Sequence, residues 1–192
     1  MYTTKKSIQE LINKINELAT HKYPLIIAID GRCASGKTTL AAYLKEQLDC
    51  NVIHMDQFFL QPHMRTPQRL AQPGGNVDYE RFLTEVLIPL TKGESFSYRP
   101  YNCQKQLLDD SIEVAPNAIT IIEGSYSCHP FLHEHYDLRV FLTTHYEEQL
   151  LRIKERNGEV SLEVFKEKWI PLEELYFNNL EIDKQCDICI TT

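Results

Sequence analysis

The chain has 192 residues, with 27 acidic against 20 basic side chains and a formal net charge of -7. This length fits one α/β domain with a sizeable core, because single domains commonly reach about 250 residues and two full domains would be cramped. The acidic balance, with no lysine- or arginine-rich patch, argues against sequence-independent binding to nucleic acid.

The first predicted element is an amphipathic helix over residues 1–20. Ser7 and Glu10 have the spacing of a capping box, and apolar residues recur on one helical face. Those apolar residues are Ile8, Leu11, Ile12, Ile15, Leu18 and Ala19. The segment lacks the uninterrupted apolar region of a signal peptide, and nowhere are there the ~20 apolar residues that a membrane span needs. We therefore expect a cytoplasmic protein that does not bind membranes.

A glycine-rich motif follows the next predicted element. Residues 24–30, PLIIAID, form a short β-branched run that indicates a fully covered parallel strand. Residues 37–48 show helical spacing of apolar side chains. The motif Gly-x-x-x-x-Gly-Lys-Thr, from Gly31 to Thr38, joins the two. Because a strand before it and a helix after it separate a phosphate-binding loop from a chance match, the motif predicts nucleotide binding over a ligand-free turn.

Each part of this motif has a predicted task. The glycines let the backbone curl, so that consecutive N–H groups form an anion-binding nest at a helix N-terminus. Lys37 is expected to reach the β- and γ-phosphates, and the Thr38 hydroxyl to bind magnesium. The predicted nucleotide-binding residues are Gly31, Arg32, Cys33, Ala34, Ser35, Gly36, Lys37, Thr38 and Thr39.

Strands and helices alternate along the rest of the chain. Strands are predicted at residues 50–55, 117–124, 137–144 and 187–191, and helices at 78–93, 145–158 and 161–180, the last interrupted at Pro171. Residues 61–76 are predicted to form a long loop, and residues 95–116 a short hairpin or excursion of strands, which commonly forms a substrate lip. Such alternation implies a parallel sheet with right-handed crossovers.

The cysteines and histidines do not suggest a metal centre. The six cysteines are scattered through a chain too large to need a disulfide framework, so we expect reduced thiols. Cys186 and Cys189 form the one Cys-x-x-Cys motif, and zinc would require a second pair of ligands. Buried or half-buried strand cysteines are therefore favoured. His133 and His135 lack a further ligand nearby in sequence and favour ordinary loop or helix-surface positions.

Two carboxylates stand at predicted strand ends. Asp56 follows the second strand and Glu123 ends the third, and in open α/β sheets ligands gather at the carboxyl ends of the strands. A carboxylate beside a γ-phosphate can hold magnesium or accept the proton of an attacking hydroxyl, although either residue could instead cap a helix. The guanine-specific motif Asn-Lys-x-Asp and the switch motif Asp-x-x-Gly are both absent. A phosphotransferase is thus favoured over a GTPase switch.

Four segments resemble a known family. GRCASGKTT, HMDQFF, YRPYN and IIEGSYSCHP...YDLRVFL occur in the same order as in the uridine kinase and phosphoribulokinase-like P-loop kinases, over roughly residues 25–158. The resemblance implies a P-loop NTPase fold, a three-layer α/β/α sandwich with a parallel sheet of about five strands, a short β excursion and a helical lid. It implies a single kinase domain over residues 1–192, with a substrate-binding region at 57–115 and a lid at 145–160.

The resemblance also implies an activity and a set of residues. The activity is ATP- and Mg²⁺-dependent transfer of a γ-phosphoryl group to a hydroxyl of a nucleoside or a similar metabolite. The implied catalytic residues are Lys37, Asp56, Glu123, Arg152 and Arg156, with Asp56 as the base, Thr38 and Glu123 at the metal, and the two arginines in the lid. The implied substrate-binding residues are Asp56, Phe58, Arg81 and Tyr101.

The chain departs from uridine kinases at two places. It has Asn102 after Tyr101, where those enzymes have an aspartate, and its lid has fewer arginines than theirs. A buried polar contact is where specificity is usually gained, so the acceptor stays open between a nucleoside, a sugar phosphate and a vitamin precursor. A nucleotide-binding regulator without transfer activity is the alternative from another class. Assembly into a homo-oligomer also stays open.

Overall fold

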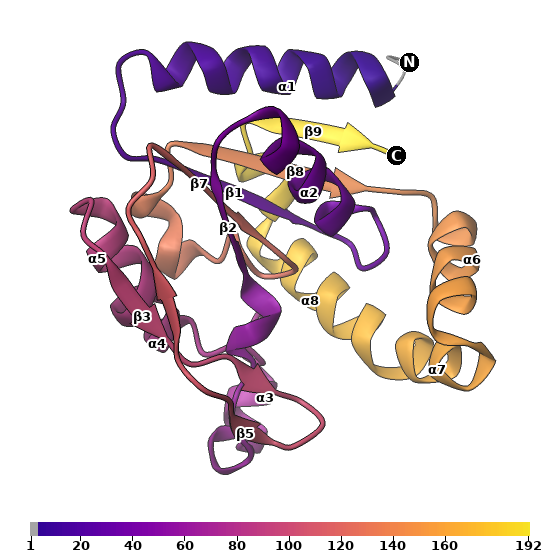
Figure 1. Cartoon of the computed structure of the whole chain (residues 1–192). Coiled ribbons are helices and arrows are strands. Elements are labelled where there is room, and N and C mark those ends of the chain that lie inside the picture. The colour runs from indigo at the N-terminus through magenta and orange to yellow at the C-terminus, as the bar shows by residue number, and fades with distance from the viewer. Residues whose placement is uncertain (1–3) are drawn as a thin grey trace.

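The computed structural model describes residues 4–192, which include a central five-stranded sheet. Its strands run parallel in the order β2–β7–β1–β8–β9 (Figure 1). Their bounds are β1 Leu25–Gly31, β2 Asn51–His54, β7 Ile119–Glu123, β8 Leu138–Thr143 and β9 Ile188–Thr191. All seven residues of β1, the central strand, are buried. The predicted parallel sheet of about five strands is confirmed.

Helices cover both faces of this sheet. On one face, α1 (Thr4–Ala19) and α2 (Lys37–Gln47) pack on Leu25, Ile27 and Ile29. On the other, Ile26 and Ala28 contact the layer that contains α4 (Tyr79–Phe82), α8 (Ile170–Leu180) and α9 (Ile182–Gln185). Successive residues of β1 therefore face opposite layers, as a strand covered on both sides requires.

The start of α1 differs from the predicted one. The helix already includes Thr4, so Ser7 lies within it and the predicted capping box with Glu10 is wrong. Residues 1–3, which the predicted helix also included, lie outside the described part of the chain. No helix among the described residues is both long enough and apolar enough to cross a membrane.

The predicted excursion lies within a longer segment between β2 and β7, residues 55–118, and from here on the name excursion refers to this whole segment. A 3₁₀ turn over Met55–Phe58 follows β2, and the predicted loop holds a second one at Pro62–Met64 and the short α3 (Pro67–Leu70). The strands pair antiparallel, β3 (Phe96–Tyr98) with β6 (Ile112–Val114) and β4 (Tyr101–Asn102) with β5 (Leu107–Leu108). The predicted excursion of short strands is therefore present.

Two long helices pass through prolines without breaking. The predicted interruption at Pro171 is wrong: α7 (Glu159–Val164) continues through a π-helical turn at Phe165–Trp169 into α8. The N–H of Ile170 bonds to the carbonyl of Phe165, five residues back. The same device precedes Pro89, where a π turn at Leu83–Leu87 joins α4 to α5 (Ile88–Thr91). The wider turn is compatible with a proline that lacks an N–H.

The predicted lid region and the cysteines complete the chain. α6 (Tyr146–Asn157) ends at Gly158, as predicted, and Figure 1 shows α6 and α7 projecting beyond the end of the sheet. Cys186 lies just before β9 and is half-buried, with its sulfur 3.8 Å from that of Cys128. Cys189 is exposed, so its predicted burial is wrong, because the side chain faces outward from the edge strand.

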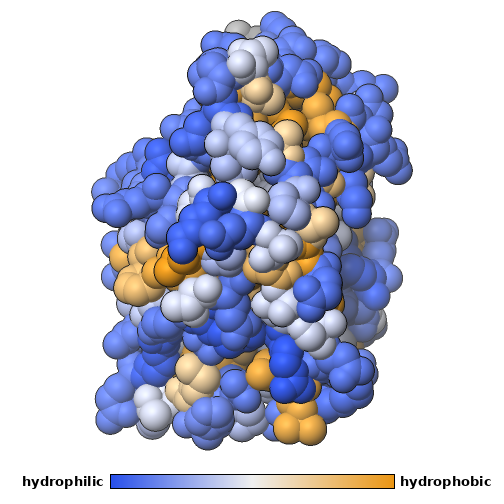
Figure 2. Space-filling model, turned by 60° about the vertical axis from the view of Figure 1, so that its left-hand side comes forward, coloured by the Kyte–Doolittle hydropathy of each residue, from blue (hydrophilic) through white to orange (hydrophobic). Residues whose placement is uncertain are grey.

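The surface shows how the apolar residues are divided. On the face in Figure 2, orange side chains form small separate patches within a largely blue surface. Scattered exposed apolar residues are ordinary for a folded domain. That face therefore shows no large continuous apolar patch.

A buried histidine connects the excursion to α8. The ring of His129, in the segment after β7, stacks on Tyr79 with 4.1 Å between centroids and on Tyr176 at 6.1 Å. Its Nδ1 accepts a hydrogen bond from the N–H of Phe131. Burial, with a smaller effect of the Arg69 charge, lowers the pKa of His129 to about 4.

This lowered pKa predicts a loss of stability in acid. Between pH 6.5 and 4 the unfolded chain gains a proton that folded His129 does not, so the free energy of unfolding falls as the pH drops, by about 3 kcal/mol from this group. His129→Gln should show a smaller fall over the same interval in urea titrations. The same change at exposed His21 is the control, and equal slopes for wild type and His129→Gln would contradict the prediction.

Candidate active site

The phosphate loop depends on two glycines. Gly31 has φ +137°, and a Cβ there would lie 1.9 Å from the carbonyl oxygen of Leu142 on β8, so a side chain does not fit. Gly36 has φ +94° and precedes the first residue of α2. The loop curls around the Lys37 ammonium, which donates to the carbonyls of Gly31 (2.7 Å) and Arg32 (2.8 Å). The loop thus brings together the N-terminus of α2 and the buried ammonium of Lys37, and both attract anions.

One buried carboxylate connects the start of this loop to two other elements. Asp30 accepts hydrogen bonds from the N–H groups of Gly31 (2.6 Å), Tyr126 (3.0 Å) and Cys128 (2.8 Å), and from the Tyr176 hydroxyl (2.9 Å). Burial raises its pKa to about 6, although these backbone hydrogen bonds act in the opposite direction. Asp30 therefore joins β1, the segment after β7 and α8.

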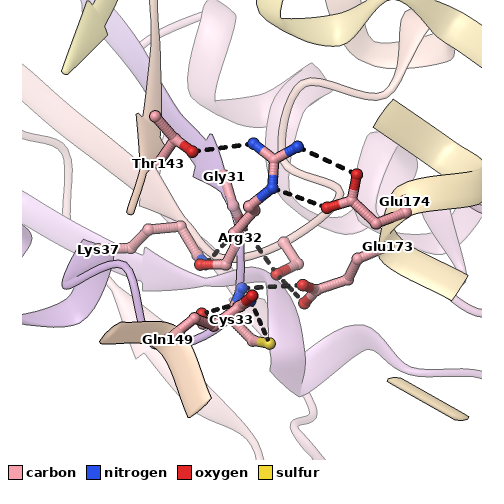
Figure 3. Close-up of polar contacts among 9 residues, drawn as sticks. Gly31, Arg32, Cys33, Lys37, Thr143, Gln149, Glu173 and Glu174 are labelled. Atoms are coloured by element: carbon pink, nitrogen blue, oxygen red, sulfur yellow. Dashed lines mark hydrogen bonds and ion pairs between the residues drawn. The ribbon is translucent and has the colours of Figure 1, made fainter. Parts of the chain in front are cut away.

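Two consecutive glutamates of α8 hold the loop from the other side (Figure 3). Glu174 accepts from Arg32 at 2.7 and 3.0 Å, and the same guanidinium donates to Thr143 Oγ1 at 2.9 Å. Glu173 accepts from the N–H of Cys33 at 2.8 Å and from the Ser125 hydroxyl at 2.6 Å. Neither glutamate was predicted as a site residue, because nothing in the local sequence indicates a contact with a loop 140 positions away.

Cys33 is enclosed by these groups. Gln149 of α6 donates to its carbonyl at 3.0 Å and to its sulfur at 3.2 Å. Burial, and then the charge of Glu173, raise the pKa of its thiol to about 12. The thiol is therefore protonated at neutral pH.

The predicted carboxylates meet at the carboxyl edge of the sheet. Thr38 Oγ1 lies 3.2 and 3.3 Å from the two carboxylate oxygens of Glu123. Glu123 also lies 2.5 Å from Nδ1 of His54, and this hydrogen bond raises the pKa of the histidine. Asp56 follows directly in the turn after β2, and burial and the charge of Glu123 raise its pKa. The order β2–β7–β1 brings Asp56, Glu123 and the loop together, while His54 was not predicted.

A cavity of about 1380 Å³ joins these groups. Of the predicted residues, its lining includes Cys33, Ala34, Ser35, Gly36, Lys37, Thr38, Thr39, Asp56, Glu123, Arg152 and Arg156. Residues of the excursion and of the π turn before α8 complete the wall, among them Phe59, Arg65, Asn76 and Trp169. One continuous cleft thus runs from the phosphate loop past both carboxylates to the excursion.

The arginines of the predicted lid lie at the loop end of the cavity. Arg152 pairs with Glu148 at 2.8 Å and donates to the carbonyl of Ala34 at 3.3 Å, so α6 already touches the phosphate loop. Arg156, one turn further on, donates to the Asn157 side chain at 2.7 Å. Within residues 4–192, no carboxylate forms an ion pair with Arg156.

Three predicted substrate-binding residues lie outside the cavity lining. Phe58 is fully buried, and Arg81 lies over its ring at 4.3 Å. Arg81 pairs with Glu85 at 3.1 Å and donates to the carbonyls of Arg99 and Gln57. Tyr101 is buried and accepts a hydrogen bond from Arg65 at 2.8 Å. All three therefore support the wall from behind, because packing and hydrogen bonds within the chain occupy them.

Neither a family model nor a curated protein matches the chain. Solved structures do match. A possible uridine kinase from Bacillus stearothermophilus is 18% identical with a TM-score of 0.70, over 97% of this chain and 98% of that one. A candidate fructose transport system kinase from Silicibacter sp. TM1040 is 20% identical with a TM-score of 0.69, over 95% and 98%.

A candidate P-loop-containing kinase from Saccharomyces cerevisiae, which carries a circular permutation, is 13% identical with a TM-score of 0.60, over 100% of this chain and 99% of that one. At these identities the similarity shows the fold alone. The chain has the α/β fold of P-loop kinases, as its sequence predicts.

The contact between Glu173 and the loop gives a testable expectation. Glu173→Gln removes the charge from hydrogen bonds that stabilise the Cys33 N–H and the Ser125 hydroxyl, so we expect the free energy of unfolding to fall by about 1–3 kcal/mol. Chemical denaturation measures this. Glu163→Gln, which removes an exposed partner of Lys166 on the same stretch of helix, should change little. Equal stability of Glu173→Gln and wild type would show that the contact contributes nothing.

Proposed function

We propose that the chain is an ATP- and Mg²⁺-dependent kinase that transfers a γ-phosphoryl group to a hydroxyl of a small molecule. One observation carries the proposal. A complete phosphate loop, a threonine hydroxyl 3.2 Å from a glutamate and a second carboxylate at the neighbouring strand end line a single cavity. Three structures with the same fold are described as kinases, which supports the same reaction class.

The residues at the metal position suit magnesium. Thr38 and Glu123 offer a hydroxyl and a carboxylate oxygen, and hard oxygen ligands are those that Mg²⁺ takes together with water and substrate phosphates. When bound, the ion would neutralise charge on the phosphates. His54 contacts Oε1 of Glu123, one of the two oxygens that Thr38 approaches, and so helps to orient that carboxylate.

Each remaining group has a role in transfer. The N–H groups of the loop and the Lys37 ammonium bind the phosphates, and Arg152 and Arg156 stabilise charge that develops as the bond to the β-phosphate breaks. Asp56 accepts the proton of the acceptor hydroxyl as the new P–O bond forms. Its raised pKa makes it a stronger base than an ordinary aspartate and suits this task.

The acceptor is open between the nucleoside that the resemblance implies and another small metabolite such as a sugar phosphate or a vitamin precursor. A screen of ATP consumption against these three classes is the direct test. Turnover of any of them supports a kinase. If ATP binds with Mg²⁺ and no acceptor is consumed, the chain is instead a nucleotide-binding regulator.

Removal of the loop lysine should abolish transfer. Lys37→Ala deletes the cation at the β- and γ-phosphates, and hydrogen bonds to charged groups are worth about 1.5–3 kcal/mol, so ATP affinity should fall about 10- to 100-fold. Calorimetric titration with ATP and Mg²⁺ measures this. Lys45→Ala, an exposed position on the same helix α2, is the matched control. Wild-type activity of Lys37→Ala would overturn the assignment of the loop.

Asp56→Asn tests the proposed base. The amide keeps the shape and much of the hydrogen bonding, so ATP and Mg²⁺ should still bind while turnover of the acceptor falls by roughly 10²- to 10⁴-fold. Steady-state kinetics with a denaturation curve separate this from unfolding, and Asp49→Asn at an exposed site is the control. Normal turnover would move proton removal to another group, with Glu123 as the first candidate.

A further inference from the structure

Arg65 is a fixed cation at the excursion end of the cavity. It follows Asp56 by nine positions and lines the same cavity. Its Nε donates to the carbonyl of Leu60 at 2.9 Å, and one terminal nitrogen, Nη2, donates to the Tyr101 hydroxyl at 2.8 Å. Two contacts therefore hold the planar guanidinium in place, which lowers the entropy cost of binding a further group.

The charge of Arg65 is not compensated by the protein. Among residues 4–192, no carboxylate forms an ion pair with it, and no group accepts a hydrogen bond from its other terminal nitrogen, Nη1. Two other arginines of the excursion, Arg69 and Arg81, are paired with glutamates. Arg65 is an exposed residue that lines the cavity, so in a chain of net charge -7 its unpaired guanidinium is available to an anionic ligand.

A second buried donor lines the same wall. Asn76 is 9% exposed, and within the described chain its buried Nδ2 has no acceptor at full hydrogen-bond distance, although it acts on the Tyr126 hydroxyl, whose pKa is raised by burial and lowered by Asn76. Its backbone carbonyl accepts from the N–H of Leu60 at 3.1 Å, and the carbonyl of Leu60 binds Arg65. The backbone of Leu60 thus connects both residues. A buried donor without a full hydrogen bond is unfavourable, and an oxygen atom of a ligand would satisfy it.

Arg65 and Asp56, the proposed base, line the same cavity. Cys103 also lines the cavity. Burial raises the pKa of its thiol, while the charge of Arg65 lowers that pKa and the charge of Asp56 raises it, so both charged groups lie near this side chain. A molecule whose hydroxyl meets Asp56 can therefore place a second group near Arg65.

We propose that the phosphoryl acceptor carries an anionic group, a phosphate monoester or a carboxylate, which Arg65 binds together with Asn76. This inference rests on the proposed kinase function and narrows its acceptor to a class that excludes free nucleosides. In the reaction, the acceptor oxygen forms the new bond to the γ-phosphorus, its proton passes to Asp56, and ADP leaves. The anionic group stays unchanged and fixes the orientation of the hydroxyl, with Tyr101 as a positioning residue for Arg65.

A titration with simple anions tests the site without knowledge of the acceptor. The protein is saturated with Mg²⁺ and a non-hydrolysable ATP analogue, so that the γ-phosphate position is filled, and is titrated with inorganic phosphate or with acetate. We expect at least one anion to bind wild type, and the tighter of the two identifies the class. Arg65→Gln should weaken binding at least about tenfold, as the loss of a charged hydrogen bond predicts.

Two further variants support this test. Arg99→Gln is the matched control, because Arg99 is exposed, lies outside the cavity lining and donates to the carbonyls of Leu108 and Asp109. Its anion binding should equal that of wild type. Tyr101→Phe removes only the hydroxyl that holds Nη2 and should weaken binding less than Arg65→Gln. Absence of binding to wild type, or equal binding to Arg65→Gln, overturns the inference.

Matched acceptors distinguish the two proposals. ATP consumption is compared for pairs that differ by the anion, such as ribose with ribose 5-phosphate and glycerol with glycerate. We expect the anionic members to be consumed with the lower KM, and Arg65→Gln to raise that KM more than it lowers kcat. Preference for the neutral members overturns the inference and leaves the kinase proposal intact. Failure of the nucleotide analogue to bind removes the kinase proposal, while the effect of Arg65→Gln on anion binding still decides the role of Arg65.

Discussion

The arrangement of the cleft depends on one buried carboxylate. Asp30 sits at the end of the central strand and accepts four hydrogen bonds, from its own strand, from the segment after β7 and from α8. A buried carboxylate is costly unless its oxygens are satisfied, so the three elements must meet at this point for the fold to be stable. The phosphate loop begins one residue later, and its position is set by the same contact.

The order of the strands then determines which polar side chains lie next to the loop. Because β7 lies between β2 and β1, Glu123 stands between Asp56 and Thr38, and each of the three arrives from a different strand end. α8 adds a second constraint, since Glu173 and Glu174 bond to consecutive residues of the loop. α8 is therefore attached to the loop by charge-assisted hydrogen bonds, which are the stronger kind.

Local patterns were enough to predict the sheet, the phosphate loop and the meeting of Asp56 with Glu123. Short β-branched runs and the spacing of glycines are local patterns, and they predict the strands and the loop. The rule that ligands bind at the carboxyl ends of parallel strands then predicts that the two carboxylates lie close together. The roles of Arg81 and Phe58 could not be predicted in this way, because whether a side chain faces a cavity or the core depends on tertiary packing. The contacts of Glu173, His54 and Asn76 likewise join residues far apart in sequence. The π turns before Pro89 and Pro171 leave no periodic signal.

The enclosure of Cys33 determines how the cleft responds to electrophiles. With a thiol pKa of about 12, roughly one molecule in 10⁵ carries the thiolate at pH 7, and the thiolate is the form that alkylating agents and peroxides attack. The cysteine of the phosphate loop is thereby shielded from covalent damage. Cys103 is exposed and lines the excursion end of the same cavity, so a thiol reagent would reach it more readily than Cys33.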